Sequence, residues 1–146
     1  MSYHLKHRIP DVETYIHIRL EAGLSRKSVE AASIGLSNGL CSIVVEYVPD
    51  DTSDATSSST PVGIGRVIGD GGCFFEIVDI AVLPDHQGRG VGNMIMNALM
   101  TYIHNHAPTT AYVSLMADHH TPEFYTRYGF EVAKLPKSAG MFLRIS

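Results

Sequence analysis

The stretch Gln87-Gly88-Arg89-Gly90-Val91-Gly92 decides how this chain is interpreted. It follows an apolar run that predicts a strand and leads into an amphipathic segment that predicts a helix. Glycines at alternate positions let the backbone turn tightly and bring several N–H groups toward one point. The helix adds its unpaired N–H groups and the positive end of its dipole. The sequence therefore predicts an anion site, and phosphate is the usual occupant of such a site.

Two common phosphate-binding motifs do not match this loop. A P-loop needs a Lys followed by Ser or Thr, and the stretch supplies no such pair. A Rossmann fingerprint needs the spacing G-x-G-x-x-G and an acidic residue about 20 positions later. Gly88, Gly90 and Gly92 miss that spacing, so other residues must show which phosphate compound the loop serves.

Length and composition predict a single domain over residues 1–146, because the chain is long enough for a substantial core and is 45% hydrophobic. The net charge of −4 and the absence of a Lys/Arg run argue against a nucleic-acid partner and favour a cationic small substrate. No stretch has the apolar length of a membrane span or a signal peptide. We therefore expect no membrane partner and a cytoplasmic location.

Cysteine and histidine spacing predicts no metal site. Cys41 and Cys73 are far apart, so they form neither a disulfide framework nor a CxxC motif, and we expect both to be reduced. His119 and His120 are adjacent and point in different directions, which does not suit shared metal ligation.

Hydrophobic periodicity and turn residues predict an α/β (α+β) chain with a mixed sheet and helices on both faces. The segment 49–61 is rich in Ser, Thr and Asp, and we expect it to be a mobile polar loop. Helices are predicted at 12–20, 28–36, 93–106 and 122–128, and strands at 41–48, 62–68, 74–83, 111–116, 130–134 and 141–145.

Two motifs carry a family resemblance. Residues 82–92 resemble the Q/R-x-x-G-x-G/A signature of the GNAT superfamily of N-acetyltransferases, and residues 124–130 resemble its F-Y-x-x-x-G-F segment. The likeness runs from about Val62 to the C-terminus, whereas the first 40 residues match only in their two-helix layout. It implies a mostly antiparallel GNAT-like sheet whose central strand pair splays apart.

The resemblance implies acetyl-CoA as the co-substrate. The backbone N–H groups of Gln87, Gly88, Arg89, Gly90, Val91 and Gly92 would then hold the pyrophosphate, with the Arg89 side chain adding positive charge. The strand edge around Ile80 and Val82 would bind the pantetheine arm as an added strand.

Glu76 and Tyr125 are the candidate catalytic residues. Glu76 lies in an otherwise apolar strand, where a carboxylate is unfavourable unless it is used or paired. We interpret it as a general base or water relay, with an ion pair to Arg66 as the structural alternative. Tyr125 matches the tyrosine that protonates the CoA sulfur in many relatives, and a phenol with a pKa of about 10 suits that role. Simple packing is the alternative for Tyr125.

The sequence also singles out two aspartates near these residues. Strict strand alternation places Asp79 on the face opposite Glu76, although a bulge would change this. Asp79 either binds the substrate cation or is structural. Asp118 stands where many relatives have an Asn seven residues before the tyrosine, so the cofactor contact of that Asn is not carried over.

The acceptor site is predicted from less specific signals. Ser25 and Arg26 lie between the first two helices, where relatives build acceptor specificity. Phe75 offers an aromatic wall, with core packing as its alternative. His119 follows the strand at 111–116 and is expected near the mouth of the site, with an ordinary surface role as its alternative.

The resulting prediction is an acetyl-CoA-dependent N-acetyltransferase that acts on a primary amine of a small molecule by direct attack in a ternary complex. A protein or peptide acetyltransferase is the first alternative, and a non-catalytic acyl-CoA-binding sensor is the second. Dimers are frequent in the superfamily, so a homodimer is a further expectation.

Overall fold

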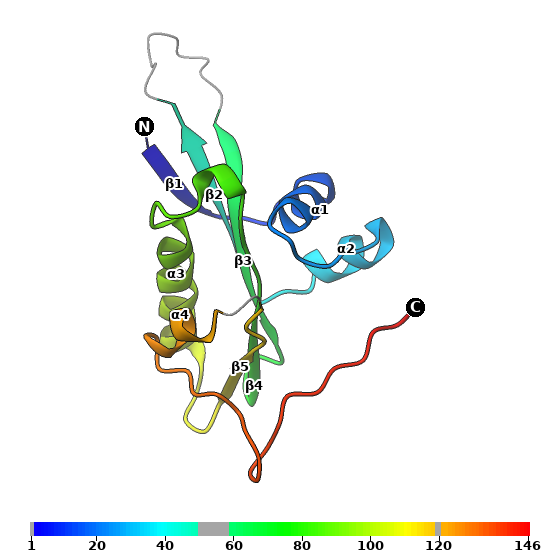
Figure 1. Cartoon of the computed structure of the whole chain (residues 1–146), viewed down its shortest axis with the longest axis vertical. Helices are drawn as coiled ribbons and strands as arrows, with labels where there is room; N and C mark the ends of the chain where they lie inside the picture. Colours follow the sequence, from blue (N-terminus) through cyan, green and yellow to red (C-terminus); the bar gives the residue numbers. More distant parts are fainter. Residues whose placement is uncertain (1, 50–58, 119–120) are drawn as a thin grey trace.

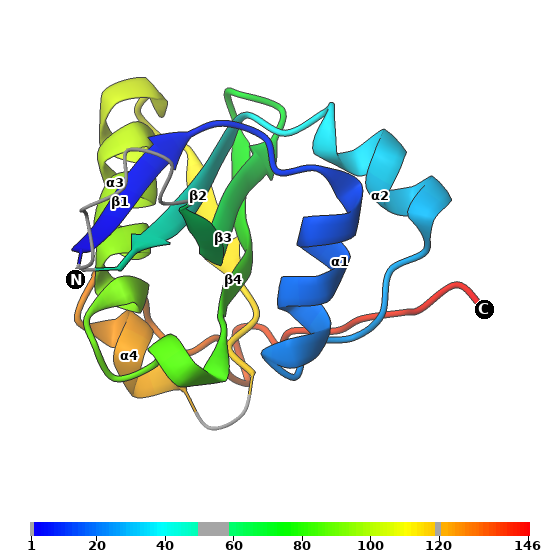
Figure 2. The ribbon, with the colours of Figure 1, turned by 90° about the horizontal axis from the view of Figure 1, so that it is seen from above.

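A computed structural model describes residues 2–49, 59–118 and 121–146. Within them, one five-stranded sheet separates two layers of helices (Figures 1 and 2). The elements are β1 (Ser2–His7), α1 (Val12–Glu21), α2 (Val29–Leu36), β2 (Cys41–Val48), β3 (Thr60–Gly69), β4 (Phe74–Val82), the 3-10 turn η1 (Pro84–His86), α3 (Val91–His106), β5 (Tyr112–Leu115) and α4 (Pro122–Thr126).

The sheet has the order β1-β2-β3-β4-β5. The first three pairings are antiparallel, and the β4–β5 pairing is parallel. This confirms the expected mixed, mostly antiparallel sheet. The predicted loop at 49–61 lies largely outside the described residues.

Each face of the sheet has its own hydrophobic core. Ile95, Met96 and Leu99 of α3 are fully buried against one face, and Tyr15 and Ile18 of α1 are buried with α2 against the other. Helix spacing of apolar residues produces both layers. The predicted arrangement of helices on both faces is therefore confirmed (Figure 2).

The first two helices begin where the sequence places their caps. The Asp11 carboxylate accepts a hydrogen bond from the backbone N–H of Thr14 at 2.8 Å, and the Ser28 hydroxyl accepts one from that of Ala31 at 3.0 Å. Such caps satisfy N–H groups that lack a partner within the helix. They fix the ends of the loop between α1 and α2.

Two parts of the predicted element order are wrong. Strand β1 was not expected; it is an edge strand in which only Tyr3 and Leu5 are partly buried, so its alternation is too short and polar to stand out. The strands expected at 130–134 and 141–145 do not form, and residues 130–146 contain neither helix nor strand. Helix α3 also begins two residues before the predicted start.

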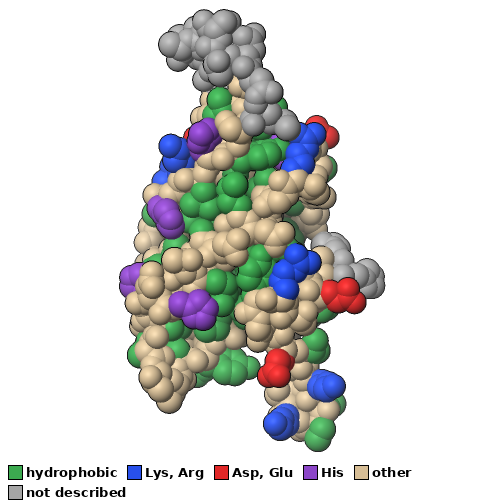
Figure 3. Space-filling view, turned by 90° about the vertical axis from the view of Figure 1, so that its left-hand side faces the viewer, with side chains coloured by type: hydrophobic (Ala, Val, Ile, Leu, Met, Phe, Trp, Pro, Cys, Tyr) green, Lys and Arg blue, Asp and Glu red, His purple; other side chains and the backbone are tan. Residues whose placement is uncertain are grey.

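The face of the molecule on the α3 side carries several histidines and scattered charges (Figure 3). The described residues that Figure 3 shows form no broad basic patch of the kind that nucleic acid binding needs. None of the helices formed by the described residues has the length and apolar character needed to cross a membrane.

Candidate functional site

Strand β4 contains a bulge at its centre. Arg66 of β3 pairs with Val78, whereas Ile64 pairs with Ala81, so β4 has one more residue than β3 over this stretch. Asp79 lies in the bulge with a φ of 62°, in the left-handed region that is unusual for a residue other than glycine. The extra residue reverses the alternation of faces along the rest of β4.

The bulge corrects the predicted placement of Asp79. Before it, Phe75 and Ile77 face the α3 core; after it, Ala81 belongs to the core beneath α1 and α2. Glu76 and Asp79, which strict alternation places on opposite faces, line the same cavity. Both carboxylates therefore belong to one site.

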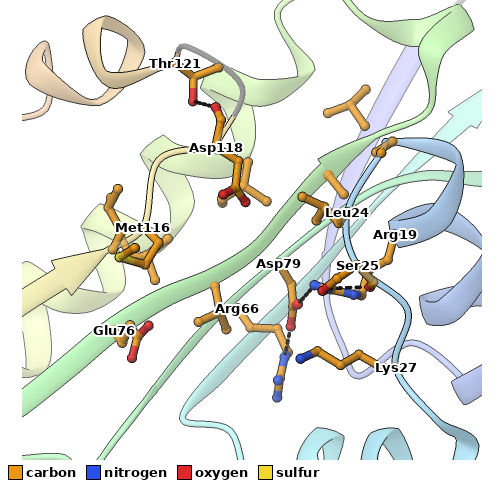
Figure 4. Close-up of a pocket in the computed structure, with 18 of the residues that line it drawn as sticks. Arg19, Leu24, Ser25, Lys27, Arg66, Glu76, Asp79, Met116, Asp118 and Thr121 are labelled. Atoms are coloured by element: carbon orange, nitrogen blue, oxygen red, sulfur yellow. Dashed lines mark hydrogen bonds and ion pairs between the residues drawn. The ribbon is translucent and has the colours of Figure 1, made fainter. Parts of the chain in front are cut away.

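The cavity lies where β4 and β5 part. Their pairing covers only Phe74–Ile77 of β4 and Tyr112–Leu115 of β5, so residues 78–82 of β4 have no β5 residue beside them. A cavity of about 930 Å³ runs along this stretch, between the β5 end and the α1–α2 loop (Figure 4). The splayed pair that the resemblance implies is thus present. Ile80 and Val82 line the cavity, as their assignment to the cofactor arm requires.

The glycine loop forms the turn that leads into α3. Gly88 and Gly90 have φ values of 73° and 85°, which L side chains rarely adopt. Gly90 is the N-cap of α3, so the first N–H groups of a 16-residue helix begin here. Gln87 lines the cavity, and its side-chain Nε2 donates to the Val82 carbonyl at 2.9 Å. This bond ties the loop to the end of β4.

The side chains of the remaining loop residues differ in their exposure to solvent. The Arg89 side chain is exposed, whereas Val91 is 1% exposed and packs in the α3 core. At Gly92, an added Cβ would lie 3.5 Å from Phe124 Cζ of α4. Val91 and Gly92 can therefore offer an anion only their backbone N–H groups.

Glu76 is half-buried and lines the cavity. Arg66, its expected structural partner, instead pairs with Asp79, with 2.8 Å between Nε and Oδ2. In Figure 4 the Glu76 carboxylate lies apart from the arginine cluster and on the β5 side of the site. The structure thus supplies a cavity-lining carboxylate without the ion pair to Arg66 that was its structural alternative.

Tyr125 lies on α4 and lines the same cavity. Burial raises the pKa of its hydroxyl above the usual 10.0, and the negative charge of Asp118 raises it further. The hydroxyl therefore remains protonated throughout the neutral range, as a proton donor must. Its ring packs edge-on against Phe124, with 5.0 Å between centroids.

The Asp79 carboxylate is fully engaged by its neighbours. Oδ1 accepts a very short hydrogen bond from Arg19 Nη1, while Oδ2 accepts from Tyr15 at 2.9 Å and from Arg66. The three charged side chains are each less than 10% exposed. Burial, followed by the charge of Asp79, raises the pKa of Tyr15 to about 12. These contacts favour the structural role for Asp79 over a substrate-cation contact.

Arg19 extends this cluster to the α1–α2 loop. Its Nη2 donates to the Ser25 carbonyl at 2.8 Å and to the Ser25 hydroxyl at 3.1 Å. Sequence reasoning missed Arg19 and Tyr15 as parts of the site, because a helix period alone does not show which strand a side chain meets. The signal available was a basic residue on the otherwise apolar face of the first helix.

The structure brings some predicted acceptor residues to the cavity and not others. Ser25 lines it, whereas Arg26 is exposed and its neighbour Lys27 lines the wall instead. Phe75 is 1% exposed in the α3 core and does not reach the cavity, which is the packing alternative. His119 lies outside the described residues.

Asp118 lines the cavity, and its carbonyl accepts hydrogen bonds from the Thr121 backbone and hydroxyl groups.

Cys41 is buried and Cys73 exposed, both are free, and neither lines the cavity. No group of three potential metal ligands occurs in the part of the chain that the structure describes. The complete lining is Tyr15, Arg19, Ala22, Gly23, Leu24, Ser25, Lys27, Arg66, Ile68, residues 76–82, Gln87, Leu115, Met116, Asp118, Thr121, Phe124, Tyr125 and Arg144.

The chain is similar to known proteins in both sequence and structure. A family model described as an acetyltransferase (GNAT) domain matches residues 49–132. The crystal structure of SA2161 from meticillin-resistant Staphylococcus aureus, described as a probable acetyltransferase, is 40% identical and has a TM-score of 0.85. That match covers 99% of this chain and all of the other.

The chain is also similar to more distant proteins. Rv2747 from Mycobacterium tuberculosis, solved in complex with CoA and NLQ, is 20% identical with a TM-score of 0.67; the match covers 90% of this chain and 73% of that one. The uncharacterized N-acetyltransferase ycf52 of Porphyra purpurea is 27% identical over 108 residues, which is 74% of this chain. The present chain matches only 58% of the length of that relative.

Proposed function

Because the chain belongs to the GNAT family of N-acetyltransferases, we propose that it uses acetyl-CoA to acetylate the primary amine of a small molecule. The observation that carries this proposal is the single cavity that joins the unpaired edge of β4, Glu76 and Tyr125. A glycine turn at the N-terminus of α3 adjoins the same strand. Candidate residues for proton acceptance, proton donation and cofactor binding thus line one cavity.

The protein has two features that match the two chemical parts of acetyl-CoA. The N–H groups of residues 87–92 suit the pyrophosphate, because a helix N-terminus and its dipole favour an anion. The free edge of β4 at 78–82 suits the pantetheine arm, whose amides can pair with backbone groups as an added strand would. Gln87 of the loop, this edge of β4 and Tyr125 line the same cavity.

The proposed chemistry is direct attack of the amine on the thioester carbonyl carbon. Glu76, directly or through a water molecule, accepts the proton that the ammonium must lose before its nitrogen can attack. The carbon–nitrogen bond forms, the carbon–sulfur bond breaks, and the Tyr125 hydroxyl gives its proton to the departing thiolate. The new amide nitrogen then loses its extra proton, which restores the Tyr125 hydroxyl. Neither cysteine lines the cavity, which supports a ternary complex over an acetyl-cysteine intermediate.

The charge on the α1 side of the cavity narrows the chemical class of acceptor that we propose. Arg19 and Arg66 share the single carboxylate of Asp79, and Lys27 lines the same wall. This wall therefore has more positive than negative charge, in contrast to the chain as a whole. An amine that also carries a carboxylate or phosphate group matches it better than a polyamine does.

The test is CoA release from acetyl-CoA across matched acceptors. We expect release with free amino acids or phosphorylated amines, and less with the corresponding amides or dephosphorylated amines, with polyamines or with peptides. Transfer to a peptide lysine or N-terminus alone would support the protein acetyltransferase instead. Calorimetric binding of acetyl-CoA without transfer to any acceptor would support the sensor.

A further inference from the structure

Lys27, in the loop between α1 and α2, is a half-buried cation that lines the cavity. Among the residues that the structure describes, no carboxylate forms an ion pair with it. An ammonium group that gives up part of its hydration without gaining a negative partner is unfavourable. Lys27 is therefore suited to an anion that the described part of the chain does not supply.

Arg66 brings a second positive charge to the same end of the cavity. In Figure 4 the ammonium end of Lys27 points toward the Arg66 guanidinium, and both side chains line the cavity. The guanidinium is held in place, because its Nη1 donates to the Gly35 carbonyl at 3.0 Å and its Nε donates to Asp79 at 2.8 Å. A fixed guanidinium beside an ammonium group suits a carboxylate or a phosphate.

Asp79 does not cancel this positive charge. Both of its carboxylate oxygens accept hydrogen bonds from the guanidinium groups of Arg19 and Arg66, so one negative charge is shared between two positive ones. The other carboxylates of the described cavity lining, Glu76 and Asp118, lie apart from this cluster in Figure 4. The α1 end of the cavity thus keeps an excess of positive charge that a bound anion would neutralise.

The strand register sets the distance between this end of the cavity and the proposed proton acceptor. Ile68 of β3 pairs with Glu76, and Arg66 lies two residues before Ile68, so both face the same side of the sheet. Glu76 and Arg66 are therefore diagonal neighbours on adjacent strands, and such positions are about 7–8 Å apart. A small molecule can thus reach Glu76 with an amine and Arg66 with an anionic group at the same time.

We propose that Lys27 and Arg66 bind the anionic group of the acceptor, and that the acceptor carries its carboxylate or phosphate a few bonds from its amine; this rests on the proposed acetyl transfer at Glu76. Lys27 is the specificity-determining residue of the pair, because Asp79 already engages the charge of Arg66 and does not engage that of Lys27. A neutral analogue leaves the Lys27 ammonium without a negative partner and therefore binds more weakly.

Calorimetric binding of matched probes tests this subsite without requiring turnover. Phosphoethanolamine is compared with ethanolamine, and β-alanine with its amide, in the presence of CoA to occupy the glycine turn; the two pairs distinguish a phosphate from a carboxylate. We expect the native chain to bind one anionic probe about 10- to 100-fold more tightly than its neutral analogue, the range of a charge-assisted hydrogen bond. Lys27→Met should abolish this preference and Lys27→Arg should keep it. Lys6→Met, at an exposed residue of β1, is the matched control.

Transfer kinetics give a second readout. Lys27→Met should raise the KM of the anionic amine by a similar factor, while kcat and the KM of acetyl-CoA stay near their native values. Equal binding of the anionic and neutral probes by the native chain would overturn the proposal, and so would a preference that survives in Lys27→Met. Failure of the proposed function has a different signature, namely Lys27-dependent binding of an anionic probe without release of CoA from acetyl-CoA.

Discussion

Glu76 and Asp79 are two carboxylates three positions apart in one strand, and their surroundings differ completely. Asp79 is 9% exposed and bound by two guanidinium groups and a phenol. Glu76 is half-buried and faces the cavity without the ion pair to Arg66 that would hold it in a structural role. Residue type alone does not distinguish a structural carboxylate from a candidate catalytic one, whereas the side chains that contact each carboxylate do.

Replacing the Glu76 carboxylate by an amide should remove the proton acceptor and keep the shape. We expect Glu76→Gln to lower kcat by about 10²–10⁴-fold, with the largest loss at low pH, where more of the amine is protonated. Steady-state rates across pH would show this. Glu13→Gln, on the exposed side of α1, is the control. Native rates in Glu76→Gln would exclude the base role.

Tyr125→Phe should lower kcat while leaving acetyl-CoA affinity nearly unchanged, because the hydroxyl acts only on the departing thiolate. Tyr128→Phe is a matched control, since that hydroxyl donates to Asn93 at 2.5 Å and does not line the cavity. Turnover and calorimetric affinity measured on both variants separate the two roles. Equal turnover in Tyr125→Phe and the native chain would assign Tyr125 to packing.

The pKa of Tyr125 also predicts a pH dependence. Burial and Asp118 raise this pKa, so the folded protein keeps the hydroxyl protonated to a higher pH than the unfolded chain does. Asp118→Asn removes the negative charge and should lower the Tyr125 pKa. A titration followed by NMR of ¹³Cζ-labelled tyrosine would measure the change. An unchanged or raised pKa would contradict the electrostatic effect of Asp118.

At the scale of elements, the glycine turn and the β4 bulge both depend on unusual backbone conformations. At Gly90 no atom lies within 4 Å of an added Cβ, but φ is 85°; at Gly35 of α2 there is equal space and φ is not positive. We expect Gly90→Val to weaken acetyl-CoA binding and Gly35→Val to leave it unchanged, as measured by calorimetry. Native affinity in Gly90→Val would remove the support for a phosphate site here.

The Asp79 cluster joins α1, β3 and β4 at the bulge. Asp79→Asn would leave the guanidinium groups of Arg19 and Arg66 buried without a negative partner, so we expect a loss of about 3–5 kcal/mol in the free energy of unfolding. Urea denaturation measures this loss. Asp70→Asn, at a fully exposed turn, should change the unfolding free energy far less. Similar losses in both variants would contradict the central role of this cluster.

At the scale of the whole molecule, the sequence was most informative where a local rule and the tertiary structure agree. Strand β2 occupies the predicted residues 41–48, because its β-branched residues are buried on both faces. The bulge at Asp79 stayed an open alternative at the level of sequence, since nothing in the local sequence requires a positive φ there. The positions of Arg19 and Phe75 relative to the cavity depend on packing between distant elements.

The strands expected near the C-terminus show a different limit. Residues 141–145 have the composition of a strand, but a strand also needs a neighbour to accept its hydrogen bonds. Among the described residues, the segment pairs with no strand. The strand prediction was therefore wrong, because composition does not show whether a pairing neighbour is present.

The unpaired stretch of β4 has a consequence for the thermodynamics of the protein. In the described part of the chain, residues 78–82 lack a strand on one side, and the proposed cofactor arm would take that place. A ligand that binds only the folded state adds about 2.7 kcal/mol of stability at 100 times its Kd. We expect the melting temperature to rise with acetyl-CoA concentration in a thermal denaturation series, and more weakly in Gly90→Val. The lifetime of the folded chain in a cell would then follow the supply of its own co-substrate.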